Sequence, residues 1–369
     1  MIKSICTLLL TLLSLALVFP ICSNAQNSRS TGALFAMTNG ADHNDIIAFE
    51  RSSNGWLRPA HRFATGGRGS GGTADPLQSQ GSLILTQNHE FLLAANAGSG
   101  DISVFRISGT MLQLTDKEPC GGSEPVAIAQ YGHLVYVVNA GGNSNVVGFR
   151  LNANGQLSQI PGSTAYLSTS NSGPGSVVFG PGGQQLLVTE KVTNLIDVFS
   201  VQEDGTLGPI VTNASAGTGA FALSFAPNGT ALVSQAPGAL SSYAVQSNGT
   251  LLTISASVPT LGAATCWQAV TPDGRFVYTS NAGSSTISGF TIGMNGTLTA
   301  LPGTVVATLP DGSTNLDMAM SVDGKFLYTL DSGTGKVSIF SIGSDGTLDS
   351  LGEVGGLPVN AGVNGLAGM

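Results

Sequence analysis

The chain has 369 residues, of which 42% are hydrophobic and only 9% are charged, and its formal net charge is −8. Its 13 lysines and arginines are too few to form the cationic clusters that bind phosphates, so we expect no nucleic-acid partner. The low charge fraction does not indicate disorder, because Val, Ile, Leu and Phe are plentiful and alternate with small polar residues.

The first 25 residues have the pattern of an export signal. Lys3 supplies a positive charge, residues 5–19 form an apolar run that is short for a membrane span, and residues 23–25 read Ser-Asn-Ala, a small-residue cleavage site. We therefore expect residues 1–25 to be a signal peptide that is removed. The remaining chain, 26–369, is expected to be secreted or periplasmic, without a membrane span, and a monomer.

One strand–loop–strand unit recurs along the rest of the chain. In residues 136–151, YVVNAGGNSNVVGFRL, a short apolar strand ends at Asn139, a Gly-rich loop follows, and a second strand carries Phe149. The residues that start this loop recur at intervals of about 43 to 57 residues, and they are Asn39, Asn96, Asn139, Glu190, Gln235, Asn281 and Asp331. An aromatic residue follows each of them, namely Phe49, Phe105, Phe149, Phe199, Tyr243, Phe290 and Phe340. Seven such copies indicate a β-propeller or a solenoid.

Each copy is expected to be all β. Residues 101–105 (DISVF) and 336–340 (KVSIF) alternate apolar and polar side chains, which is typical of half-buried strands. Turn dipeptides that suit type I′ hairpins follow most copies, and they are Asn54-Gly55, Asn154-Gly155, Asp204-Gly205, Asn248-Gly249, Asn295-Gly296 and Asp345-Gly346. A second turn precedes the loop-start strand at Asn228-Gly229, Asp273-Gly274 and Asp323-Gly324. Two hairpins and one wider loop give four antiparallel strands, which is one propeller blade.

The two ends of the repeat array complement each other. The first copy lacks an inner strand, because residues 26–32 are short and polar, whereas residues 364–369 (NGLAGM) are surplus after the seventh copy. They resemble the inner strands at 81–86 and 124–129. We therefore predict an all-β fold, a seven-bladed β-propeller of four-stranded antiparallel blades, whose ring is closed by the C-terminal strand completing blade 1. A linear solenoid is the alternative, but it requires polar end caps.

The cysteines are expected to be unpaired. Cys6 and Cys22 lie in the expected signal peptide, and lipidation at Cys22 is disfavoured because bulky residues precede it. Cys120 and Cys266 fall on well-separated blades of the predicted ring, whereas a disulfide requires Cα atoms within about 7 Å. We expect two buried free thiols.

Strand order assigns the functional loops to one face of the ring. The loop-start residues and the long inter-blade connections share this face, which we call the loop face, and the short hairpins on the other face leave little room for a site. A central mouth on the loop face is therefore the expected binding site. Five residues there are candidate ligand-binding groups: Asp75, Gln78, Gln80, Trp267 and Gln268. Their alternative role is structural, in which the polar groups satisfy the loop backbone and Trp267 is half-buried at a blade junction.

Candidate catalytic residues are few. Glu190 and Lys191 place two charges near the mouth, and Arg68 is a cation set among glycines. The alternatives are a Glu190–Lys191 ion pair and a loop arginine that donates to carbonyl groups. Residues 67–72 match G-x-G-x-x-G but open no helix, and the sequence has no metal-ligand spacing, so we expect no cofactor and no metal.

With these seven units in place, the chain resembles the seven-bladed lactonase-like propellers, which include 6-phosphogluconolactonase and fungal 3-carboxymuconate cyclase. Residues 180–199 and 271–292 carry the resemblance, which extends over 33–369. It implies a catalytic His, Arg and Glu at positions that correspond to Gly175, Phe221 and Gln235.

None of these three positions matches, so a lactone carbonyl has no evident polarising group there. The expectation is therefore an exported lactonase-family propeller that binds a small ligand, such as a carbohydrate or lactone, or a partner at the loop-lined mouth. The alternative is a carboxylic-ester hydrolase acting on a sugar lactone through Glu190, Lys191 and Arg68. A structural propeller that binds protein through its loop face is a third possibility.

Overall fold

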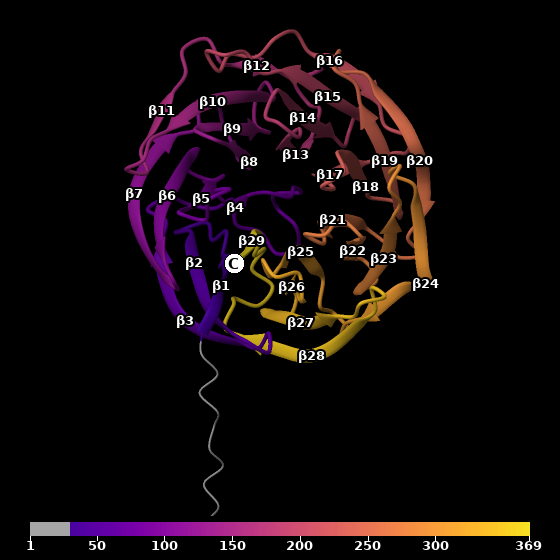
Figure 1. The fold of residues 1–369 in the computed structure, drawn as a ribbon. Coiled ribbons are helices and arrows are strands. Elements are labelled where there is room, and N and C mark those ends of the chain that lie inside the picture. The colour runs from indigo at the N-terminus through magenta and orange to yellow at the C-terminus, as the bar shows by residue number, and fades with distance from the viewer. Residues whose placement is uncertain (1–29) are drawn as a thin grey trace, which may run out of the picture.

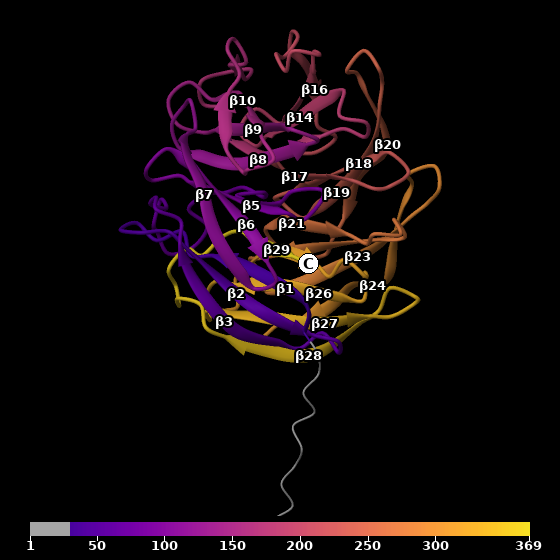
Figure 2. The same cartoon turned by 60° about the vertical axis from the view of Figure 1, so that its left-hand side comes forward.

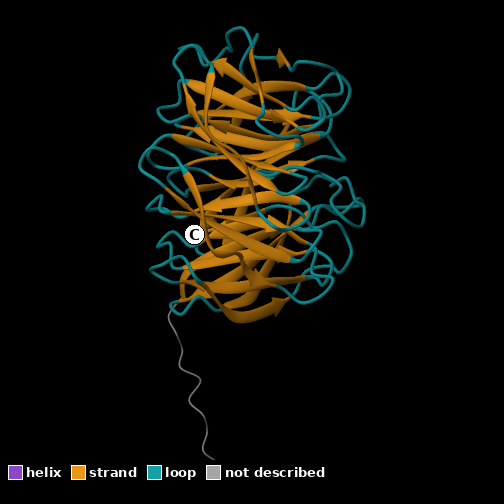
Figure 3. Ribbon diagram, turned by 90° about the vertical axis from the view of Figure 1, so that its right-hand side faces the viewer, coloured by secondary structure: helices purple, strands orange, loops and turns teal. Residues whose placement is uncertain are grey.

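The computed structural model describes residues 30–369, and in this part of the chain every regular element is a β-strand (Figure 3). The strands form seven sheets that stand around a central axis like blades (Figures 1 and 2). The expected signal peptide, residues 1–25, lies outside the described residues. Within the described range, no helix has the length and apolar character of a membrane span.

The first three blades follow one another in sequence. Blade 1 contains β1 (Ser30–Met37), β2 (Asp45–Ser52), β3 (Leu57–Ala64) and the C-terminal strand β29 (Leu366–Gly368). Blade 2 contains β4 (Leu83–Leu85), β5 (Phe91–Asn96), β6 (Asp101–Ser108) and β7 (Met111–Pro119). Blade 3 contains β8 (Pro125–Tyr131), β9 (Leu134–Asn139), β10 (Asn145–Leu151) and an outer strand that is broken into β11 (Leu157–Gln159) and β12 (Ala165–Tyr166).

The other four blades repeat the same order from the centre outwards. Blade 4 contains β13 (Pro174–Phe179), β14 (Gln185–Glu190), β15 (Leu195–Ser200) and β16 (Val211–Ala214). Blade 5 contains β17 (Ala220–Phe225), β18 (Thr230–Gln235), β19 (Ala239–Val245) and β20 (Leu251–Pro259). Blade 6 contains β21 (Thr265–Val270), β22 (Phe276–Asn281), β23 (Thr286–Ile292) and β24 (Leu298–Thr308). Blade 7 contains β25 (Asn315–Met320), β26 (Phe326–Asp331), β27 (Lys336–Ile342) and β28 (Leu348–Gly355). The predicted seven-bladed architecture is confirmed.

The C-terminal strand closes the ring as predicted. β29 pairs antiparallel with β1, and Ala367 lies opposite Phe35. The Met369 N–H donates to the Ala33 carbonyl at 2.8 Å, and the Met37 N–H donates to the Gly365 carbonyl at 2.9 Å. The inner edge of blade 1 is therefore paired rather than open.

The predicted type I′ geometry of the Asn-Gly and Asp-Gly turns is wrong. In the β2–β3 hairpin only Gly55 has a positive φ, 84°, and its N–H donates to the Ser52 carbonyl at 3.0 Å. This is a type I turn followed by a left-handed glycine. The physical reason is visible at Asp204, whose Oδ1 accepts the N–H of Thr206 at 2.9 Å, so the side chain closes the turn locally.

Packing between neighbouring blades holds the ring together. The aromatic residues of the repeat are buried, with exposed fractions of 0–3%, and they are Phe49, Phe105, Phe149, Phe199, Tyr243, Phe290 and Phe340. Tyrosine hydroxyls add hydrogen bonds from one blade to the next, and Tyr328 of blade 7 donates to the Gly55 carbonyl of blade 1 at 3.0 Å. Cys120 and Cys266 are free and buried, as predicted.

Candidate functional site

The mouth of the ring on the loop face is covered by the connection between β3 and β4. We call residues 66–80 the crossing segment, and Figure 1 shows it reaching over the centre of the ring toward β13, β17 and β21. Its first half is bound to blade 1, where the N–H of Gly69 donates to the Gly40 carbonyl at 2.7 Å and that of Gly71 to the Asn39 carbonyl at 3.0 Å. Its second half spans to the far blades.

Three candidate ligand-binding residues fasten this second half. The side-chain amide of Gln80 pairs with the backbone of Gln268, donating to its carbonyl at 2.8 Å and accepting its N–H at 3.1 Å. The indole N–H of Trp267 donates to the Ser79 carbonyl at 2.9 Å, and the Gln80 N–H donates to the Gly175 carbonyl at 2.9 Å. Gln80 and Gln268 therefore bind each other across the mouth, and Trp267 binds the backbone of the crossing segment.

Trp267 is more deeply buried than the structural alternative anticipated. Its exposed fraction is 1%, and its ring meets Phe221 edge-on at a centroid distance of 5.1 Å. Gln268 is equally buried, and its amide nitrogen donates to the Leu232 carbonyl at 2.8 Å and to Ser224 Oγ at 3.0 Å. Neither side chain offers a free face on which a sugar ring could stack.

Lys191 and Asp75 are charged groups at the second half of the crossing segment. Lys191 Nζ donates to the carbonyls of Gln78 and Pro174, both at 2.7 Å, and lies 5.4 Å from the Phe221 ring centroid. Burial lowers the pKa of Lys191 to about 8, although the charge of Asp75 opposes this shift. Burial raises the pKa of Asp75 to about 6. Three groups oppose this rise, namely the Gln78 N–H, the charge of Lys191 and the amide of Asn364. This ammonium group therefore ties the crossing segment to blade 4.

Glu190 has other partners than Lys191 and forms a buried acid pair with Asp197. Glu190 accepts the Ser168 N–H at 2.9 Å and the hydroxyls of Ser168 and Thr193. Burial, and then the neighbouring Glu190, raise the pKa of Asp197 to about 9. Burial opposes ionisation of Glu190 as well, but hydrogen bonds from Asp197, Ser168 and Thr193 outweigh it and lower its pKa. The opposite directions of the two pKa shifts favour a protonated Asp197 beside an ionised Glu190.

The two members of this pair should respond differently to an isosteric amide. We expect Asp197→Asn to change the free energy of unfolding at neutral pH by less than about 1 kcal/mol, because the amide N–H replaces the acid proton. Glu190→Gln should lower the free energy of unfolding by about 1–3 kcal/mol, because the new amide N–H would face groups that themselves donate hydrogen bonds to Glu190. Urea unfolding of both variants measures the difference, and equal losses would contradict the proton assignment.

Arg68 lies at the other end of the crossing segment. Its side chain is exposed and donates to the Gly98 carbonyl at 3.5 Å, and its own N–H donates to Ser99 Oγ at 2.8 Å. These partners belong to the β5–β6 loop of blade 2, whereas Glu190 is held in blade 4. Arg68 is therefore a loop arginine that donates to a carbonyl group, which is the structural role considered from the sequence.

The three positions at which the resemblance implies catalytic groups have structural roles here. A Cβ atom at Gly175 would lie 2.7 Å from the Phe221 carbonyl oxygen, so no histidine fits there without moving the backbone. Phe221 is 3% exposed and packs against Trp267. The Gln235 amide donates to Ser241 Oγ at 2.8 Å and accepts from Ser257 Oγ at 3.0 Å.

A cavity lies toward the opposite face of the ring, which we call the hairpin face. It has a volume of about 450 Å³ and is lined by the ends of β4, β8, β13 and β17 and by the hairpin turns that follow them. Another cavity of about 350 Å³ follows the channel wall between β4, β25 and β29. The expectation that the hairpin face leaves little room for a site is therefore wrong. The sequence signal that was missed is a pair of aromatic residues, because β13 ends at Phe179 and β17 ends at Phe225. The inner strands β4, β21 and β25 end instead at the non-aromatic residues Leu85, Val270 and Met320.

The sheet order, the closed ring and the repeated hairpins define a seven-bladed propeller. The sequence matches the family described as "Lactonase, 7-bladed beta-propeller" over residues 42–165 and 223–362, and the chain belongs to this family. No curated protein gives a significant sequence match.

Solved structures of similar fold include enzymes and proteins named as enzymes. A putative 6-phosphogluconolactonase from Bacteroides fragilis has a TM-score of 0.72 at 17% identity, covering 93% of this chain and 99% of that chain. The periplasmic gluconolactonase PpgL of Pseudomonas aeruginosa has a TM-score of 0.69 at 18% identity, covering 90% and 99%. A putative 6-phosphogluconolactonase from Bacteroides uniformis has a TM-score of 0.71 at 19% identity, covering 92% and 100%. At these identities the likeness establishes the fold alone.

Proposed function

We propose that this protein is an exported, monomeric lactonase-family propeller that binds a small ligand or a partner and does not hydrolyse lactones through the family's His, Arg and Glu. The observation that carries the proposal is the state of the three corresponding positions. Gly175 has no room for a side chain, Phe221 packs against an indole, and Gln235 is held by hydroxyl groups. A departing carboxylate would meet no cation and no oxyanion hole among them.

Export is part of the proposal. It is supported by the signal-like pattern of residues 1–25 and agrees with the printed description of the Pseudomonas aeruginosa neighbour as a periplasmic gluconolactonase. A compartment outside the cytoplasm would separate the protein from phosphorylated sugar intermediates, which favours an unphosphorylated ligand.

A ligand at the loop-face mouth would have to compete with the crossing segment. Asp75, Gln78, Gln80, Trp267 and Gln268 would become available to it only if the hydrogen bonds between Gln80 and Gln268 and between Trp267 and Ser79 opened. Each such bond contributes about 1 kcal/mol to stability, so a ligand that offers equivalent partners could replace them. Carbohydrates and sugar lactones have the required density of hydroxyl groups.

Lactone hydrolysis remains the second candidate because of one feature of the mouth. The amine of Lys191 has a pKa lowered to about 8 by burial and lies near Asp75, so a neutral amine is accessible at mildly alkaline pH. Such an amine could act as a general base toward water. Glu190 and Arg68 lie apart from it and would take no part in this arrangement.

Hydrolysis of a lactone panel distinguishes the two candidates. Purified protein is expected to hydrolyse phosphorylated and unphosphorylated sugar lactones at the rate of buffer alone. The same panel should be screened by thermal shift, since a ligand at a hundred times its Kd stabilises the native state by about 2.7 kcal/mol. Hydrolysis above buffer that is lost in Lys191→Gln, but kept in Arg68→Gln, would overturn the binding proposal in favour of the second candidate.

A further inference from the structure

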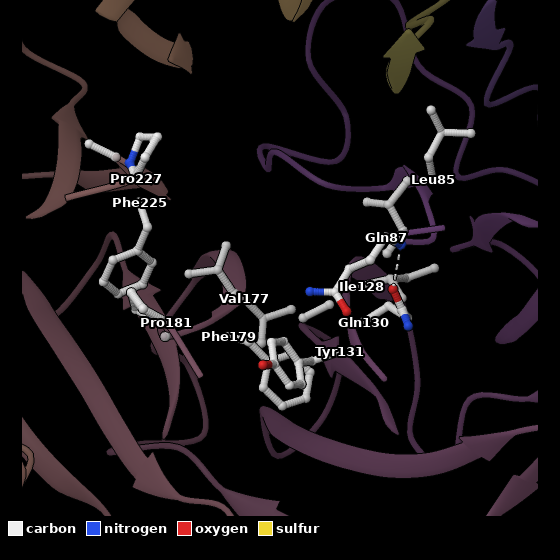
Figure 4. A pocket seen from close by; sticks show the side chains of 15 residues that line it. Leu85, Gln87, Ile128, Gln130, Tyr131, Val177, Phe179, Pro181, Phe225 and Pro227 are labelled. Atoms are coloured by element: carbon white, nitrogen blue, oxygen red, sulfur yellow. Dashed lines mark hydrogen bonds between the residues drawn. The ribbon is translucent and has the colours of Figure 1, made fainter. Parts of the chain in front are cut away.

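The cavity of about 450 Å³ on the hairpin face has the features of a ligand pocket. Inner strands of four successive blades, β4, β8, β13 and β17, converge on it, and the turns after them form its rim. Figure 4 shows Phe225, Pro181 and Pro227 on one side, Gln87 and Gln130 on the other, and Val177 between them. A volume of this size falls within the range of pockets that enclose small molecules.

The chemistry of the lining disfavours a charged ligand. None of the residues that line the cavity is an Asp, Glu, Lys, Arg or His. A charged group placed there would lose hydration without gaining a partner, which is costly. Aromatic rings are concentrated instead, with Tyr131 and Phe179 tilted by 41° at a centroid distance of 5.6 Å and Phe225 half-buried on the next blade. Such rings favour a flat, apolar ligand.

One polar group in the pocket is free to bind. The N–H of Gln87 donates to Gln130 Oε1 at 2.9 Å, and the N–H of Gly132 donates to Gln87 Oε1 at 3.1 Å, so both amides are fixed in place. The amide nitrogen of Gln130 donates to the Gly132 carbonyl. Gln87 is exposed at the rim, and its side-chain nitrogen has no acceptor among the described residues, so a ligand can supply one in place of solvent.

From these features we propose that the hairpin-face pocket binds a neutral, planar ring compound that carries a hydrogen-bond acceptor, with the ring against Phe179 and Phe225 and the acceptor at Gln87. The inference goes beyond the proposed function, because it adds a second binding site with its own ligand class. It differs from the loop-face mouth in position and chemistry, because the mouth contains charged groups and is filled by the crossing segment.

Prodan, a neutral naphthyl ketone with environment-sensitive fluorescence, is a suitable probe, and anilinonaphthalene sulfonate is its charged counterpart. Prodan is expected to bind saturably with one site per chain, and the sulfonate at least tenfold more weakly. Phe225→Asp should weaken prodan binding at least tenfold, and Gln87→Leu several-fold. Val322→Asp is the matched control, because Val322 is a 53% exposed residue of a blade 7 hairpin turn outside the pocket, and it should leave binding unchanged.

Thermal unfolding of each variant establishes that it is folded, and Phe225→Ala replaces Phe225→Asp if the latter unfolds. No saturable prodan binding, equal affinity for the sulfonate, or equal weakening by Val322→Asp would each overturn the pocket assignment. Failure of the wider proposal is separate, since lactone hydrolysis would refute that proposal whether or not prodan binds.

Discussion

Deletion of residues 364–369 is expected to abolish most of the free energy of unfolding. The deletion removes β29, whose Leu366 and Ala367 are 5% and 6% exposed, and leaves β1 without its inner neighbour. Burial of one leucine contributes about 1.5–3 kcal/mol, and each backbone group left buried without a partner costs about 1–3 kcal/mol. The sum is on the order of 5–10 kcal/mol, which is comparable with the whole stability of a typical domain.

Urea unfolding and size-exclusion chromatography of residues 26–363 test this expectation against residues 26–369. The shortened chain should be unfolded, or should associate through the open edge of β1. Val359→Ala is a control in the same C-terminal region, because Val359 is 60% exposed, and it should unfold like the parent chain. A shortened monomer with the parent's unfolding midpoint would show that closure by β29 contributes little.

The architecture could be predicted because its determinants are local and repeated. Alternating apolar residues and turn dipeptides recur in each blade, so every copy supports the others. The closing strand was predictable from a mismatch between the ends, a missing inner strand near residue 30 and a surplus strand at 364–369. The turn type was not predictable. Asn54 and Asp204 can either adopt a left-handed conformation or close the turn with a side-chain oxygen, and the same dipeptide is compatible with both.

The site was only partly predictable, because long-range contacts decide it. Residue type identified Gln80, Trp267 and Gln268, but not that Gln80 binds Gln268 or that Trp267 binds the Ser79 carbonyl, since the residues of each pair lie 188 positions apart. The pocket on the hairpin face was missed for a related reason. It depends on how Phe179 and Phe225 of neighbouring blades face a common space, and the short turns beside them give no indication of such a space.

Asp317 is the buried carboxyl group that links the closing strand to blade 7. It is 2% exposed, it accepts the Met318 N–H at 2.8 Å through Oδ1, and its Oδ2 accepts the Leu366 N–H at 2.7 Å. Burial raises its pKa to about 7, the charge of Asp75 adds to the shift, and the two N–H groups oppose it. This role was not predicted, because no motif marks Asp317 within the inner strand Asn315–Met320.

Stability should therefore fall as the pH rises from about 4 to about 7, and Asp317→Asn should remove the part of this dependence that comes from Asp317, leaving the parts that come from Asp75 and Asp197. Between its unfolded pKa of 3.8 and its folded pKa of about 7, Asp317 binds more protons in the folded state, so the free energy of unfolding decreases with pH. At about 1.4 kcal/mol for each pKa unit, the decrease is on the order of 4 kcal/mol. Urea unfolding at several pH values measures it. Leu366→Ala is the matched control, because it weakens the same closure at every pH and keeps the carboxyl group. Parallel pH profiles of the parent chain and Asp317→Asn would refute the assignment.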